Sequence, residues 1–141
     1  MEYLTLPHTD LQVSRLIAGC MGLGGGWGRA TVINASLEKQ ARDFVETALE
    51  LGINFFDHAN IYAHGRAEEV FGRLFKQMPS LRERMVLQSK VGIRWEDDPA
   101  GTPQRFDFSY EHIVEAVDAI AKIVDRRIEL VELHGGCGHA V

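Results

Sequence analysis

The stretch LEKQARDFVETALELGINFFD, residues 37–57, contains the repeating unit from which the fold follows. Apolar residues recur at helical spacing over residues 37–49, and Gly52 then ends the helix. Residues 53–57 are mostly apolar and prone to β structure, so they predict a short buried strand. We interpret the stretch as an amphipathic helix, with Ser36 as its N-terminal cap, followed by a strand.

The same alternation of helices and strands continues on both sides of this stretch. An apolar run at residues 16–21 predicts an earlier strand that leads into a mobile, glycine-rich loop at residues 22–28. The alternating residues 2–13 predict a short hairpin before the main fold. The downstream elements are a helix at 67–78, a strand at 85–91, a polar loop, a helix capped by Ser109 and a strand at 128–133.

Strands that alternate with amphipathic helices predict an α/β fold with a parallel sheet, either doubly wound or a (β/α)8 barrel. Periodicity alone does not choose between the two. The dinucleotide fingerprint needs glycines at its first, third and sixth positions and a helix that starts at once. No register of residues 22–28 meets that spacing, and the next helix begins only near Leu37, so we reject a Rossmann-type loop here. An active-site loop and a plain solvated turn both remain open.

Composition excludes several classes of function. The chain has 141 residues, 45% of them apolar, and a net charge of -5, which argues against nucleic acid as a partner. We expect no membrane partner, because no run of about 18 apolar residues occurs. With only Cys20 and Cys137, and no signal-peptide pattern at the N-terminus, we expect a cytoplasmic protein without a disulfide framework.

Polar residues lie at the ends of the predicted strands, where α/β folds place their chemistry. Asp57 ends one strand, Tyr62 follows five residues later, and Lys90 lies at the end of the next strand. A tyrosine is a weak acid, with a reference pKa near 10, unless a nearby cation stabilises its phenolate. Lys90 is placed to do that, but a structural ion pair beside a half-buried tyrosine explains the pattern equally well. His134, at the end of the last strand, is either a carbonyl-polarising or a structural histidine.

An ordered set of motifs resembles the aldo-keto reductase family. The set covers nearly the whole chain up to about residue 134. The matching motifs are Asp57-x-Ala59-x-x-Tyr62, Gly65-x-x-Glu68-x-x-Phe71-Gly72, Ser89-Lys90, a helix that opens Phe108-Ser109-Tyr110-Glu111-His112-Ile113, and Leu133-His134. The resemblance implies a (β/α)8 barrel, of which residues 1–141 would form one truncated domain with the N-terminal hairpin and the first four β/α units.

The resemblance also implies a reaction, the NADPH-dependent reduction of an aldehyde or ketone to an alcohol. By this resemblance, Tyr62 is the general acid and Lys90 stabilises its phenolate. Asp57 orients Lys90, and His134 guides the carbonyl of the substrate. Gly22, Leu23 and Asp57 would contact the cofactor. Trp27 would face the substrate, unless it packs beneath its own loop.

The sequence departs from the family after His134, where residues 135–139 replace the motif Arg-Pro-Asp. The family has four more β/α units beyond this point, and they carry most of its cofactor contacts. We therefore expect open sheet edges that favour a homodimer or other self-association. The alternative function is an inactive remnant that acts through such contacts. Cys137 and His139 with His134 offer too few ligands on a flexible tail, so we expect no metal site.

Overall fold

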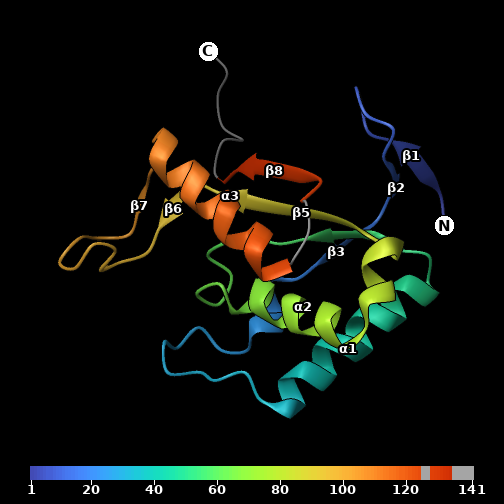
Figure 1. Ribbon diagram of the computed structural model, residues 1–141, viewed down its shortest axis with the longest axis horizontal. Helices are drawn as coiled ribbons and strands as arrows, with labels where there is room; N and C mark the ends of the chain where they lie inside the picture. Colours follow the sequence, from blue (N-terminus) through green and yellow to red (C-terminus); the bar gives the residue numbers. More distant parts are fainter. Residues whose placement is uncertain (125–127, 135–141) are drawn as a thin grey trace.

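The computed structural model describes residues 1–124 and 128–134 of the chain (Figure 1). Its centre is a parallel sheet of four strands in the order β3-β4-β5-β8, which confirms the predicted α/β class. The strands are β3 (Ile17–Gly19), β4 (Phe55–Asp57), β5 (Val86–Val91) and β8 (Leu130–Leu133). The connecting helices are α1 (Ala35–Glu50), α2 (Arg66–Gln77) and α3 (Tyr110–Val124), with short 3-10 helices η1 (Met21–Gly24) and η2 (Pro79–Arg84).

The main hydrophobic core lies between the sheet and the helices. Successive side chains of a strand point to opposite faces, and Ala18, Phe56 and Leu87 are the apolar strand residues of this core. Phe71 and Leu74 of α2 are each 1% exposed and pack into the same core. The periodic apolar positions of the sequence therefore form one continuous layer beneath the sheet.

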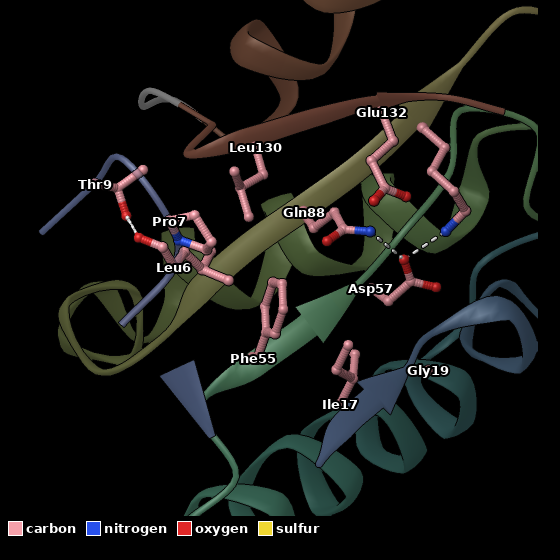
Figure 2. Close-up of a pocket in the computed structure, with 11 residues that line it drawn as sticks. Leu6, Pro7, Thr9, Ile17, Gly19, Phe55, Asp57, Gln88, Leu130 and Glu132 are labelled. Carbon is pink, nitrogen blue, oxygen red and sulfur yellow. Dashed lines mark hydrogen bonds and ion pairs between the residues drawn. The ribbon is translucent and has the colours of Figure 1, made fainter. Parts of the chain in front are cut away.

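The opposite face of the sheet is hollow, as expected for one wall of a barrel. A cavity of about 820 Å³ lies over it, and Figure 2 shows side chains from all four strands that point into this space. Apolar residues, such as Phe55 and Leu130, lie toward the amino ends of the strands, and Asp57 and Glu132 lie toward the carboxyl ends. The polar end is where barrel proteins place their chemistry.

The predicted N-terminal hairpin is confirmed, since β1 (Tyr3–Thr5) pairs antiparallel with β2 (Gln12–Ser14). Its turn residues Leu6, Pro7 and Thr9 line the apolar end of the hollow. Leu6 packs there against a small second core that contains Val13, Phe55 and Val86. The hairpin thus covers the end of the hollow that lies opposite the polar residues.

Two local predictions were wrong. The glycine-rich segment begins as the 3-10 helix η1, and Gly24 is buried, so the chain does not enter an irregular loop directly after β3. The polar loop after β5 contains an unpredicted hairpin of β6 (Ile93–Arg94) and β7 (Arg105–Phe106). Its two-residue strands are too short to leave a periodic signal in the sequence.

The N-terminal cap of α1 is also not the predicted residue. Asn34, one residue before the helix, accepts a hydrogen bond from the backbone N–H of Leu37 at 2.9 Å, whereas Ser36 lies inside the first turn. Both residues are good caps by type, so composition alone did not separate them. The predicted cap of α3 is confirmed, because the Ser109 hydroxyl accepts from the backbone N–H of His112.

The hydrogen bond from Leu37 to Asn34 should contribute measurably to stability. Asn34→Ala is expected to lower the free energy of unfolding by about 1 kcal/mol, because a first-turn N–H of α1 loses its acceptor. Ser36→Ala is the matched control, with an expected change within about 0.5 kcal/mol. Urea unfolding followed by circular dichroism measures both values. A larger loss in Ser36→Ala than in Asn34→Ala would restore the cap assigned from the sequence.

Both edges of the four-stranded sheet carry exposed apolar residues. Ile17 on β3 is 51% exposed and Leu133 on β8 is 50% exposed. Unpaired strand edges with apolar side chains favour association with other chains. Self-association through these edges therefore stays a prediction.

No helix in the described ranges has the length and apolarity that crossing a membrane requires. The predicted absence of a metal site concerned His134, Cys137 and His139. The last two of these residues lie outside the described part of the chain.

Candidate active site

Four polar residues from three segments of the chain gather at the carboxyl ends of the strands. Asp57 is the last residue of β4, and Lys90 lies near the end of the neighbouring parallel strand β5. Tyr62 lies in the turn between β4 and α2, and His134 follows β8. Parallel strands bring their carboxyl ends to one edge of the sheet, so residues far apart in sequence meet there. The structure thus brings the four predicted residues together.

Lys90 is the centre of the hydrogen-bond network in this cluster. Its ammonium donates to Asp57 Oδ1 at 2.5 Å and to the main-chain carbonyl of His58 at 2.8 Å. The same ammonium lies 4.9 Å from the centre of the Tyr62 ring. Gln88 donates to Asp57 Oδ1 at 3.1 Å and holds the carboxylate from the other side (Figure 2). Lys90 is therefore fixed by two acceptors beside the tyrosine.

Tyr62 is oriented by its neighbours on both sides. Its hydroxyl donates to Asp57 Oδ2 over a long 3.5 Å, and its ring meets the His134 ring edge to face, with centroids 6.3 Å apart. The main-chain N–H of His134 donates to the Val91 carbonyl at 2.6 Å and ties the residue to β5. Tyr62 therefore lies in contact with Asp57, Lys90 and His134.

The protonation states of the cluster follow from its surroundings. Burial opposes the charge of Lys90, but its bonds to Asp57 and Tyr62 outweigh this and raise the pKa of Lys90. Burial and the nearby positive charge of Lys90 lower the pKa of His134, although Asp57 and Glu132 partly oppose them. At neutral pH the site therefore combines a cationic lysine with a neutral histidine.

Trp27 lies in an aromatic group formed by three loops. Its ring is 5.9 Å from that of Trp95, and His64 stacks on Trp95 at 4.0 Å. A ring nitrogen of His64 also bonds the Trp27 carbonyl at 3.1 Å. Trp27 is 48% exposed, so it does not lie packed beneath its own loop. His64 and Trp95 had no role in the sequence-based interpretation.

The glycine-rich segment is held by an arginine that sequence reasoning also missed. Arg66, at the start of α2, is 8% exposed and donates to the carbonyls of Gly24, Gly26 and Gly28. Of the two residues assigned to the cofactor in this segment, Gly22 borders open space. The side chain of Leu23 instead packs against the main core. Only Gly22 therefore presents an unobstructed surface.

A second layer of polar residues lies behind the cluster, on the helix side of the sheet. Glu68 of α2 is 4% exposed and accepts a hydrogen bond from the Ser89 hydroxyl at 2.6 Å. His58 is 3% exposed, and its ring packs on Phe71 with centroids 4.2 Å apart. The sequence did contain a signal, because Glu68 lies three residues before Phe71 on the apolar stripe of a predicted helix.

These two buried groups titrate in opposite directions. Burial, with the charge of Lys90 added, lowers the pKa of His58 from 6.5 to about 3. Burial raises the pKa of Glu68 from 4.5 to about 7, against the Ser89 hydrogen bond and the charge of Lys90.

A second hollow lies beside Glu68. Arg94, His112 and Glu115 line this hollow together with Glu68.

The opposite shifts give a prediction for the pH dependence of stability. Between pH 4.5 and 6.5 folding releases a proton at His58 and takes one up at Glu68, so the two effects largely cancel. Glu68→Gln removes the proton uptake at position 68, so only the proton release at His58 remains. Its free energy of unfolding should therefore fall, relative to wild type, by roughly 1 kcal/mol for each pH unit of acidification in this range.

Urea unfolding at a series of pH values measures this slope. Glu69→Gln is the matched control, because Glu69 is the next residue on α2 and its side chain is 48% exposed. The control should follow the pH dependence of the wild type. Parallel curves for all three proteins would show that Glu68 has an ordinary pKa in the folded state.

A parallel sheet of the barrel type, with polar residues gathered at the carboxyl ends of its strands, is typical of the (β/α)8 class of proteins. Comparison with known families makes the assignment specific. The model of the aldo/keto reductase family matches residues 15–135. The chain belongs to the aldo/keto reductase family.

Individual relatives agree with this assignment. The chain is 32% identical to versiconal hemiacetal acetate reductase of Aspergillus parasiticus, over 95% of the chain and 42% of the relative. It is 35% identical over 99 residues to the NADH-specific methylglyoxal reductase of Escherichia coli, covering 68% of the chain and 28% of the relative. The holo structure of an aldo-keto reductase from Bacillus halodurans superposes with a TM-score of 0.73 at 35% identity, over 96% of the chain and 41% of that structure. The chain thus spans about two fifths of the length of several relatives.

Proposed function

We propose that this site reduces the carbonyl group of an aldehyde or ketone to an alcohol, with a nicotinamide cofactor as the hydride donor. The observation that carries the proposal is the placement of Lys90, whose ammonium is held by Asp57 and the His58 carbonyl beside the ring of Tyr62. A fixed cation next to a phenol favours release of the phenolic proton. The membership of the aldo/keto reductase family supports the same reaction.

In this proposal Tyr62 protonates the carbonyl oxygen as the carbonyl carbon becomes saturated. The bound nicotinamide would supply the hydride to that carbon. The proton leaves the Tyr62 hydroxyl, and the resulting phenolate is stabilised by Lys90 until solvent returns a proton. Neutral His134 donates a hydrogen bond to the same oxygen and so orients the substrate. Asp57 and Gln88 keep Lys90 in place throughout.

The residues present fit the nicotinamide end of the cofactor. Gly22 borders open space near the carboxyl end of β3, so a flat ring can approach the backbone there, with Asp57 on the neighbouring strand β4. Two arginines of the loops are already engaged, Arg66 with the glycine carbonyls and Arg94 with Asp107. We therefore propose that Gly22 and Asp57 contact the nicotinamide, and that neither Arg66 nor Arg94 binds the phosphates of NADPH.

Trp27 is proposed to form part of the substrate-binding wall, together with Trp95. The Trp27 ring is half exposed and contacts that of Trp95, and exposed aromatic rings supply apolar contact area with a defined shape. The substrate is therefore a small carbonyl compound with an apolar portion that these rings can cover.

Binding of NADPH to the purified protein tests the proposal. Nucleotide fluorescence measures the dissociation constant, and light scattering on the same sample measures the mass of the binding species. Saturable micromolar binding by a species of defined mass is the expected result. Lack of binding by a folded, monodisperse sample would remove the cofactor from the proposed reaction.

A further inference from the structure

A small cavity lies directly behind the site, between the sheet and helices α2 and α3. Its volume is about 10 Å³, which is close to the smallest space that holds one water molecule. Phe71, Leu87 and Ile120 form apolar parts of its wall, and His58 and Glu68 form the polar part. The cavity is separate from the open hollow over the other face of the sheet.

The polar groups of the cavity wall have unused hydrogen-bonding capacity. Both ring nitrogens of His58 are buried, and neither has a hydrogen-bond partner among the described residues. The Glu68 carboxyl group uses one oxygen for the Ser89 hydroxyl, so its second oxygen remains an acceptor. A neutral imidazole offers one donor and one acceptor. One water molecule complements this set, because it can bond both an imidazole nitrogen and a carboxyl oxygen.

Energetics favour a hydrated cavity over a dry one. A buried polar group without a partner costs about 1–3 kcal/mol, and His58 would bear this cost in a dry cavity. Ordering a water molecule costs at most about 2 kcal/mol, and the bonds it makes to two polar groups offset that cost. A purely apolar cavity of the same size would stay empty, so the histidine and glutamate decide the outcome.

We propose that His58 and Glu68 bind one internal water molecule in this cavity, and that His58 thereby acts as a positioning residue for Lys90. The ring of His58 is fixed by Phe71 on one side and by the water on the other. Its main-chain carbonyl then points at the Lys90 ammonium, 2.8 Å away. The positioning role rests on the function proposed for Lys90, whereas the water site does not.

Nuclear magnetic resonance of the purified chain tests the water site without any need for activity. In protein labelled with 15N-histidine, a long-lived water should give cross-relaxation to the ring protons of His58. Glu68→Met, which keeps the length of the side chain but removes its polar atoms, should abolish this signal. Glu68→Gln should retain it, and Glu69→Met is the control for a substitution on the exposed side of α2. A folded wild-type protein without the His58 signal would overturn the proposal.

The pKa of Lys90 tests the positioning role in the same samples. Both Glu68→Met and Glu68→Gln remove the negative charge that Glu68 carries when Lys90 titrates, so the two variants are compared with each other. Loss of the bond to the His58 carbonyl should make this pKa lower by about 0.5 unit or more in Glu68→Met than in Glu68→Gln. The 13C shift of the carbon next to the Lys90 amine reports the titration. If the water is lost in Glu68→Met and the pKa of Lys90 is the same in the two variants, the positioning role is wrong. Neither readout depends on turnover, so a failure here is distinct from a failure of the reductase proposal.

Discussion

Tyr62→Phe is expected to lower kcat for the NADPH-dependent reduction of an aldehyde by about 10² to 10⁴, because a positioned general acid contributes that much to such reactions. The substitution removes only the hydroxyl that lies beside Asp57, and the ring can still meet His134 edge to face. Binding of NADPH should therefore change little. Loss of absorbance at the nicotinamide band, measured at saturating cofactor, gives kcat for the two proteins.

Tyr110→Phe is the matched control for this loss. Tyr110 begins α3 and is 77% exposed, so the same chemical change there should leave kcat unaffected. A Tyr62→Phe protein that keeps the rate of the wild type would show that another group supplies the proton. The alternative acid in the cluster would then be His134.

Phe71→Ala is expected to have the largest effect on stability, a loss of about 3–5 kcal/mol in the free energy of unfolding. Phe71 is 1% exposed and its ring meets those of Phe56, Phe75 and His58. Truncation would leave a cavity beneath the sheet at the junction of β4 and α2. Urea unfolding followed by tryptophan fluorescence measures the loss.

Phe106→Ala provides the comparison for Phe71→Ala. Phe106 is 62% exposed on β7, and its ring stacks on that of Phe108. Its truncation should cost no more than about 1 kcal/mol. Equal losses in the two variants would mean that the layer between sheet and helices is not the main source of stability.

The sequence predicted the order of the main elements because each has a strong period. The apolar stripes of α1 and α2 and the apolar runs of β4 and β5 are long enough to identify the type of element. Local detail was less accessible. The cap of α1 involved a choice between two suitable residues, Asn34 and Ser36, and the short hairpin β6–β7 lies in a loop rich in turn-forming residues.

For the site, too, the main residues could be predicted from the sequence and the local surroundings could not. Asp57, Tyr62, Lys90 and His134 were named from their positions at strand ends and from the family motifs, and the structure brings them into one cluster. His58 was not given a role, because the direction of a side chain just after a strand depends on the tertiary fold. Sequence spacing shows which residues reach an edge of the sheet. It does not show which of them turn inward behind it.

Transfer of deuteride from NADPH labelled at C4 of the nicotinamide to an added aldehyde tests the central claim most directly. The expected product is an alcohol that carries one deuterium on the former carbonyl carbon. The wild-type protein and Tyr110→Phe should form it, and Tyr62→Phe should form it at least about a hundredfold more slowly. If a folded sample binds NADPH and aldehyde but forms no deuterated alcohol, the four-residue cluster is not a carbonyl-reducing site.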